Sequence, residues 1–285
     1  MSVALRIIPK LDIKGPNLVK GVHLEGLRVL GKPEVFAKYY YEQGADELFY
    51  QDVVASLYGR NCLHDIISKT AKEIFIPLTV GGGIRTIEDI SNILRAGADK
   101  VSINTAAIEN PKLITEASKI FGASTIVVSI EAIRQADGSY MAFTDNGRNR
   151  SRKEVVSWAK EVEELGGGEI VLTSVDREGS GEGFDINLIK QVAEAITLPI
   201  VVHGGAGNIT HILDLLNKIS VSGIAISSMF HYNTLKHFRD FEDFNKEGNL
   251  DFIKSMKGFS MIKDSSILEV KEVLNNNNIH CRNNA

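Results

Sequence analysis

The sequence predicts a (β/α)8 barrel of the TIM type, built from two similar (β/α)4 halves. Short apolar runs rich in Val and Ile alternate with amphipathic stretches about eight times along roughly 240 residues. Most runs lack polar alternation, which is typical of parallel strands buried on both faces. The stretches "PLTVGGGIRT" and "PIVVHGGAGNI" repeat one strand-to-glycine turn about 120 residues apart. A doubly wound open sheet is the alternative, but strand number and even spacing favour the barrel.

The elements follow from local patterns. The expected strands are residues 5–11, 47–53, 78–81, 100–104, 125–131, 169–175, 200–203 and 223–227. Helices with a 3.6-residue period are expected at 33–44, 86–98, 151–167 and 185–196. In the second helix, Thr86 and Asp89 have the spacing of a capping box. Residues 1–245 should form the barrel, and 246–285 a C-terminal extension with an amphipathic helix and a disordered Asn-rich tail.

The composition excludes several classes of protein. The chain has 285 residues, 44% hydrophobic and 24% charged, with a net charge of −4, so nucleic-acid binding is not expected. Two cysteines without CxxC spacing and seven histidines without an HxxxH cluster give no reason to expect a disulfide framework, a metal or another cofactor. Because no signal peptide or 18-residue apolar window is visible, we expect a cytoplasmic protein without membrane contact.

The repeated glycine turns suggest two anion sites. In such barrels the ends of strands seven and eight commonly bind phosphate, because glycines let backbone N–H groups approach the anion. The expected sites are Gly204, Gly205, Ser227 and Ser228, and, across the mouth, Gly82, Gly83, Asn104 and Thr105. His203 lies in the first turn and, if protonated, would donate to a phosphate. The substrate should then be elongated, with a phosphate at each end; glycines that only shape the turns are the alternative.

Charged residues mark both ends of the strands. Asp12 ends strand one and Glu131 ends strand five, so the two should face each other and could act as general acid and base. Asp52 and Glu178 follow strands two and six, and helix capping is the alternative for such residues, especially for Asp52. Lys20 either reaches the ligand or covers the rim.

A second set of charges begins four strands, at the opposite face of the barrel. These residues are Arg6, Glu47, Lys100 and Glu169. Taken alone, they are best explained as salt bridges that close the bottom of the barrel.

The motifs together resemble one known family. "RIIPKLDIK", "GADEL", "TVGGGIRT", "GADKVSINTAAIENP", "EIVLTSVDREG" and "GGAG", spread over about residues 4–240, are similar to the cyclase subunit of imidazole glycerol phosphate synthase, of histidine biosynthesis. The resemblance implies a lyase that binds a ligand with two phosphates, with Asp12 and Glu131 as the catalytic pair and Thr173 and Gly179 among the substrate-binding residues.

The resemblance also implies a heterodimer. A glutaminase subunit would dock on the bottom face, and its ammonia would enter at the four-charge ring and pass through the barrel. There it would convert a bis-phosphorylated ribulosyl nucleotide to imidazole glycerol phosphate and an aminoimidazole carboxamide ribotide. The resemblance therefore favours an ammonia gate over simple closure of the barrel as the role of the four-charge ring.

Several positions depart from the family pattern. Glu131 and Glu178 stand where the family has Asp, Lys10 replaces a Cys, and His203 replaces a small residue. One extra methylene moves a carboxylate by roughly 1–1.5 Å, which can cost about a hundredfold in rate. Because the resemblance covers most of the chain, the family cyclase activity is still the first interpretation. The alternatives are a paralogue that passes ammonia to another acceptor, such as an acetamido sugar of bacterial surface glycans with a sugar amidotransferase as partner, or a non-catalytic ammonia conduit.

Overall fold

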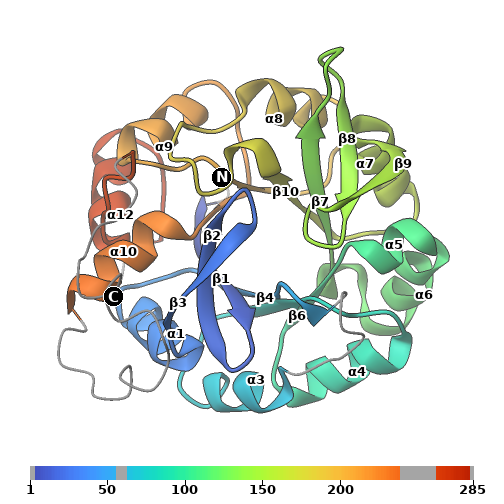
Figure 1. Cartoon of the computed structure of the whole chain (residues 1–285), viewed down its shortest axis with the longest axis horizontal. Coiled ribbons are helices and arrows are strands. Elements are labelled where there is room, and N and C mark those ends of the chain that lie inside the picture. The colour runs from blue at the N-terminus through green and yellow to red at the C-terminus, as the bar shows by residue number, and fades with distance from the viewer. Residues whose placement is uncertain (1–3, 56–62, 238–260, 283–285) are drawn as a thin grey trace.

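Eight parallel strands close into a barrel in this computed structural model, which describes residues 4–55, 63–237 and 261–282 (Figure 1). In chain order the strands are β1 (Arg6–Lys14), β4 (Leu48–Asp52), β5 (Leu78–Gly81), β6 (Lys100–Ile103), β7 (Ile126–Arg134), β10 (Glu169–Ser174), β11 (Ile200–His203) and β12 (Gly223–Ile226). Neighbouring strands run β10–β11–β12–β1–β4–β5–β6–β7, and β7 pairs back with β10. The predicted (β/α)8 barrel is confirmed.

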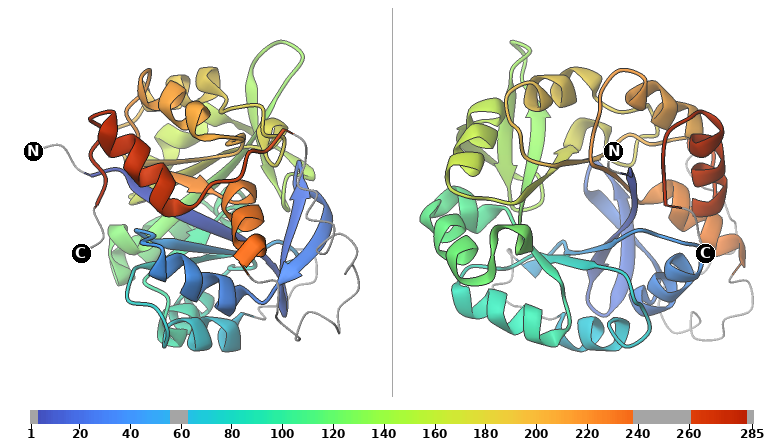
Figure 2. Two further views of the ribbon diagram at one scale, coloured as in Figure 1. Left: turned by 90° about the vertical axis from the view of Figure 1, so that its left-hand side faces the viewer. Right: turned by 180° about the vertical axis from the view of Figure 1, so that it is seen from behind.

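Helices form a ring around the strands (Figure 2). They are α1 (Pro33–Glu42), α3 (His64–Thr70), α4 (Ile87–Ala96), α5 (Thr105–Glu109), α6 (Lys112–Phe121), α7 (Val155–Glu164), α8 (Ile186–Ala193), α9 (Ile209–Leu216), α10 (Ser228–His237) and α12 (Ile267–Asn276). The expected capping box is present, because the Thr86 hydroxyl accepts from Asp89 N–H while the Asp89 carboxylate accepts from Thr86 N–H.

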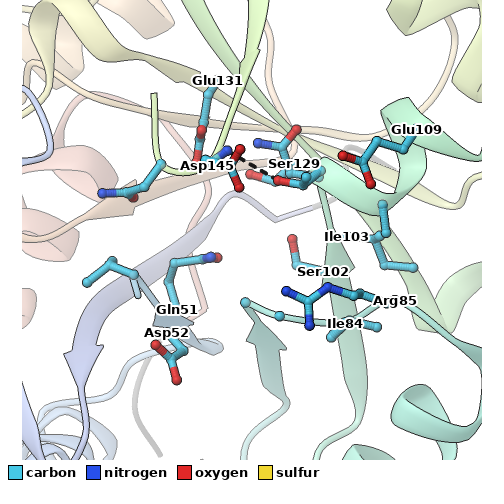
Figure 3. Close-up of a pocket in the computed structure, with 17 residues that line it drawn as sticks. Gln51, Asp52, Ile84, Arg85, Ser102, Ile103, Glu109, Ser129, Glu131 and Asp145 are labelled. Atoms are coloured by element: carbon cyan, nitrogen blue, oxygen red, sulfur yellow. Dashed lines mark hydrogen bonds between the residues drawn. The ribbon is translucent and has the colours of Figure 1, made fainter. Parts of the chain in front are cut away.

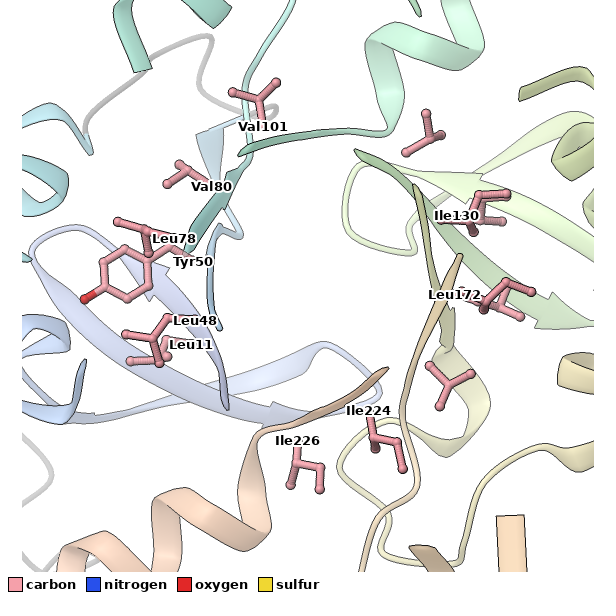
Figure 4. Packing of buried hydrophobic residues seen from close by; sticks show 14 of the residues in the cluster. Leu11, Leu48, Tyr50, Leu78, Val80, Val101, Ile130, Leu172, Ile224 and Ile226 are labelled. Carbon is pink, nitrogen blue, oxygen red and sulfur yellow. The ribbon is translucent and has the colours of Figure 1, made fainter. Parts of the chain in front are cut away.

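Side chains on the strands alternate between the barrel interior and the helices. Leu11, Leu48, Val80 and Ile224 belong to the large core cluster between strands and helices (Figure 4). A separate apolar interior layer fills the barrel and consists of Ile8, Phe49, Val127, Val171, Val201 and Ala225. Since both faces of each strand are buried, the strands read as continuous apolar runs in the sequence.

Two hairpins beside the C-terminal ends of β1 and β7 were not predicted. Strands β2 (Asn17–Val22) and β3 (Glu25–Gly31) follow β1, in a stretch for which the sequence analysis expected no strand or helix. Strands β8 (Tyr140–Thr144) and β9 (Asn149–Glu154) follow β7, and β9 includes residues 151–154, which were wrongly assigned to a helix. The polar stretch "NRSRKE" forms a partly exposed antiparallel strand, so it lacks the apolar signal of the barrel strands.

The C-terminal residues join the same core as the barrel. Helix α12 is the predicted amphipathic helix, and Ile267, Val270 and Leu274 pack in the large core cluster. The predicted disorder of the tail is wrong up to residue 282, because Cys281 is fully buried and Leu5 N–H donates to His280 O at 2.9 Å. The expected domain boundary near residue 245 and the last three residues lie outside the described residues.

Candidate active site

The C-terminal ends of the strands bring the predicted catalytic residues to one face. Asp12 on β1 and Glu131 on β7 lie on strands four places apart in the closed order of eight. The two glycine turns follow β5 and β11, which are also four places apart. The barrel therefore places the members of each pair on opposite sides of its mouth.

A cavity of about 290 Å³ opens between β4, β5, β6 and β7 (Figure 3). Its lining includes six of the residues that the sequence singled out: Asp52, Gly82, Gly83, Asn104, Thr105 and Glu131. At its base, Ser102 Oγ and the side-chain carbonyl oxygen of Asn104 are buried and have no hydrogen-bond partner. Buried polar atoms normally have partners, so these two atoms fit a polar ligand in the cavity.

Glu131 occupies a buried position in the lining of this cavity. Burial raises the pKa of its carboxyl group to about 7, although the Gly147 N–H, which donates to Oε2 at 2.8 Å, and the Lys10 charge both act against the rise. At neutral pH a substantial fraction of Glu131 is therefore protonated, and the group can donate a proton as readily as it accepts one.

The β8–β9 hairpin contacts three site residues, two through its turn and one through strand β8. Besides the Gly147 contact with Glu131, Asp145 N–H donates to the Thr105 hydroxyl at 3.2 Å. The Asn104 side chain donates to Phe143 O at 3.1 Å. The hairpin that the sequence missed therefore orients the acid and one anion site.

Asp12 lies in a buried network of charges on the other side of the mouth. Burial alone would raise its pKa, but the ammonium groups of Lys10 and Lys20 outweigh this and hold the pKa well below its usual range. Lys10 forms an ion pair with Asp12 through a short contact, and Lys20 Nζ lies 3.8 Å from the second carboxylate oxygen. Lys20 in turn forms a short ion pair with Glu178. The predicted Asp12, Lys20 and Glu178 are thus brought together.

His203 is neutral, so the condition for donation by an imidazolium, protonation of the ring, is not met here. Burial lowers its pKa well below the usual value, and the nearby Lys10 charge lowers it further. Its ring nitrogens lie 3.3 Å from Thr173 Oγ1 and 3.4 Å from Ser227 Oγ, two other predicted residues. His203 therefore orients hydroxyl groups rather than adding positive charge.

The glycines of the second turn are also required for packing. A Cβ on Gly204 would lie 2.6 Å from Ser174 O, and one on Gly205 would lie 2.1 Å from Gly183 O. A Cβ on Gly179 would meet Gly21 O of the β2–β3 hairpin at 2.6 Å. Ser228, at the start of α10, is buried beside this turn. Asp52 accepts from Val54 N–H at 3.0 Å, a local turn contact that exists alongside its place in the cavity.

The four charges at the strand starts form a closed ring at the opposite end of the barrel. Arg6 pairs with Glu47 at 2.8 Å and with Glu169 through a short contact. Lys100 bridges the same two carboxylates at 3.0 and 3.1 Å. Each cation thus contacts both anions, and the apolar interior layer lies between this ring and the active site.

Other classes of site are not supported by the part of the chain that is described. There, no three or more His, Cys, Asp or Glu side chains gather in a way that could hold a metal ion. Within the same ranges, no helix combines the length and apolar character needed to cross a membrane.

Sequence reasoning missed several residues of the site. The additional cavity residues include Gln51, Arg85, Ser102, Ser129, Glu109, Asp145 and Asn146. Two of them had a readable signal, because Ser102 and Ser129 precede Asn104 and Glu131 by two positions and so face the same side of their strands. Asp145 and Asn146 come from the unpredicted hairpin turn, where "DNG" was the available signal.

These features define a duplicated (β/α)8-barrel enzyme with two carboxyl groups of well-separated pKa at its mouth. A family model described as "Histidine biosynthesis protein" matches residues 6–236. The chain is 55% identical over 205 residues to the imidazole glycerol phosphate synthase subunit HisF of Legionella pneumophila, covering 72% of this chain and 97% of that protein. It is 44% identical to the subunit of the same name from Bacillus cereus (strain G9842), over 81% of this chain and 91% of the relative. The corresponding subunit of Methanopyrus kandleri is 43% identical. The chain belongs to this family of cyclase subunits of histidine biosynthesis.

Proposed function

We propose that the chain uses ammonia from a glutaminase partner to convert a bis-phosphorylated ribulosyl aminoimidazole carboxamide nucleotide to imidazole glycerol phosphate. The observation that carries the assignment of roles is the separation of pKa values between Asp12 and Glu131. Two carboxyl groups whose environments push their pKa values apart are suited to opposite steps of proton transfer. Asp12 acts as the anion and Glu131 as the acid.

The chemistry follows from these charge states. Ammonia attacks the ketone of the ribulosyl chain, and the oxygen must gain protons before it leaves as water. Glu131 supplies a proton, because near neutral pH its carboxyl group is partly protonated. Asp12 stays ionised and stabilises the positive charge that develops on the attacking nitrogen. Ring closure and release of the aminoimidazole carboxamide ribotide complete the reaction.

The two phosphates of the substrate would occupy opposite sides of the mouth. On the cavity side, we assign one phosphate to the Gly82–Gly83 turn with the Thr105 hydroxyl and Arg85. Backbone N–H groups matter here, because Asp52, Glu109 and Asp145 make the rest of the lining acidic. The second phosphate is assigned to the turn at Gly204 and Gly205 with Ser227 and Ser228, and Lys10 and Lys20 are positive charges that act on His203 of the same turn.

The glutaminase would dock on the face that carries the charge ring. Two large apolar side chains are exposed at this end, Phe75 just before β5 and Ile120 just before β7, with exposed fractions of 81% and 60%. Exposed apolar groups around a charged opening fit a protein partner. Ammonia would enter when the ring opens and cross the apolar interior layer, which excludes water and charged species.

The test is turnover of the nucleotide with added ammonium, followed by loss of substrate absorbance. Wild type should turn over. Glu131→Gln should nearly abolish the activity, and Glu131→Asp should leave it unchanged or improve it. Glu116→Gln, which changes an exposed carboxyl group of α6 outside the cavity, is the control and should have little effect.

The alternative acceptors remain outcomes of the same test. The relatives named above all carry the histidine-pathway name, which favours the first proposal. A wild-type chain that binds the nucleotide weakly and does not convert it would point instead to another acceptor, such as an acetamido sugar held by a sugar amidotransferase. Failure to rescue a histidine auxotroph that lacks its own cyclase subunit would support that reading.

A further inference from the structure

We propose that Lys10 is a further positioning residue of the active site: its ammonium group, lodged between the Phe49 ring and the Asp12 carboxylate, fixes that carboxylate in place and balances its charge. The proposal rests on the role assigned to Asp12 in the proposed reaction. Asp12 is a buried anion next to the apolar interior layer of the barrel.

Lys10 points into the barrel rather than out to solvent. It lies two positions before Asp12 on β1, so both side chains face the interior. The side chain is only 5% exposed, and its Nζ lies 5.8 Å from the centre of the Phe49 ring. Phe49 belongs to the apolar interior layer, so the Lys10 side chain lies between that layer and the charged residues of the active site. An ammonium over an aromatic face is attracted by the ring, which offsets part of the cost of burial.

The backbone of Lys10 is fixed as firmly as its side chain. It pairs with Phe49 in the register of β1 and β4. The Ser227 hydroxyl donates to Lys10 O at 2.8 Å, which joins β1 to the end of β12. The ammonium therefore has little freedom to leave Asp12, and the carboxylate is aimed by a rigid strand.

Lys20 cannot replace this contact. Its Nζ lies 3.8 Å from Asp12 but forms its short hydrogen bond with Glu178. Leu24 N–H and Lys20 both approach the Glu178 carboxylate, which ties this second pair to the β2–β3 hairpin. Within the described part of the chain, Lys10 is thus the cation that hydrogen-bonds Asp12.

Charged and titratable groups from several elements surround Asp12 in the described part of the chain. They are Lys10 of β1, Lys20 of β2, Glu131 of β7, His203 of β11 and His231 of α10, with Glu178 behind Lys20. Both imidazoles are neutral, because burial lowers the pKa of each. Removing Lys10 leaves the more distant Lys20 as the positive charge facing a fully buried carboxylate.

The experiment follows the Asp12 carboxyl carbon by ¹³C NMR in the isolated chain labelled at the aspartate carboxyl groups, with Asp12→Asn used to assign the signal. The wild-type signal should stay that of an anion down to about pH 3. In Lys10→Met and Lys10→Gln the midpoint should rise by about 1–3 pH units, the usual effect of losing one adjacent opposite charge. Lys14→Met, an exposed lysine on the same strand, should not move it.

An unchanged midpoint in a variant that still folds, as judged by circular dichroism, would overturn the proposal. It would attribute the low pKa of Asp12 to Lys20 alone. The second variant guards against a failure of the first to fold. This titration needs no turnover, so it separates the role of Lys10 from the fate of the proposed reaction. Where wild type is active, kcat with ammonium should fall roughly tenfold to a hundredfold in Lys10→Met, with a smaller change in KM.

Discussion

The buried carboxyl group of Glu131 should make the stability of the protein depend on pH in a measurable way. Below about pH 4 the group is protonated in both the folded and the unfolded chain. As the pH rises, the unfolded chain ionises first, near the ordinary value of 4.5, whereas the folded chain keeps its proton until about pH 7. The unfolded state then binds fewer protons, so the free energy of unfolding falls between these two values and levels off above pH 7.

The size of the effect follows from the shift. A rise from 4.5 to about 7, at about 1.4 kcal/mol per pH unit, corresponds to a loss of about 3 kcal/mol at pH 8. Glu131→Gln removes the ionisable group but keeps its shape. The variant should therefore gain about 3 kcal/mol relative to wild type on going from about pH 4.5 to pH 8.

Urea unfolding of wild type and Glu131→Gln at about pH 4.5 and about pH 8 measures how the difference in their free energies of unfolding changes with pH. Shifts in other groups, including the opposite shift of Asp12, are largely shared by wild type and variant and cancel. Glu109→Gln, at the exposed edge of the same cavity, serves as the control and should show no such gain. Equal pH dependence in wild type and Glu131→Gln would refute the burial argument and, with it, the role of Glu131 as an acid near neutral pH.

Three further outcomes are expected. Lys100→Ala should reduce glutamine-dependent turnover about tenfold more than ammonium-dependent turnover, because tenfold corresponds to at least one charge-assisted hydrogen bond of the ring. Equal losses in the two assays would show that the ring is purely structural. In Glu131→Gln, which removes the titration of Glu131 itself, sulfate binding measured by calorimetry should be flat from about pH 5.5 to 8, because burial keeps His203 neutral throughout. Tightening at the acidic end in this variant would contradict the neutral imidazole. Lys271→Met should destabilise the fold by about 3–5 kcal/mol in urea unfolding, because Asp46 would lose its 2.7 Å partner while remaining buried. Glu272→Gln, at an exposed position of the same helix, is the control. Equal stability of the two variants would rule out the Lys271–Asp46 ion pair as a major contact.

The sequence by itself determined the barrel and the strand-end residues of its candidate site, because parallel strands buried on both faces leave unbroken apolar runs. The duplicated glycine turns and the carboxylates at Asp12 and Glu131 then mark strand ends, which must meet at one face. The same reasoning gave the charge ring, since Arg6 and Glu169 begin strands that pair into one closed sheet.

Tertiary structure alone decided how those residues are ionised and what holds them. Charge state depends on burial and on neighbours from distant elements: Asp12 is kept an anion by Lys10 and Lys20, whereas Glu131 is driven towards neutrality. The hairpin turn that brings Gly147 to Glu131 left little trace in the pattern, because exposed antiparallel strands carry no apolar run. Periodicity records which side of a strand a residue faces, but the pKa of a group depends on the distances to charges that only the folded chain brings together.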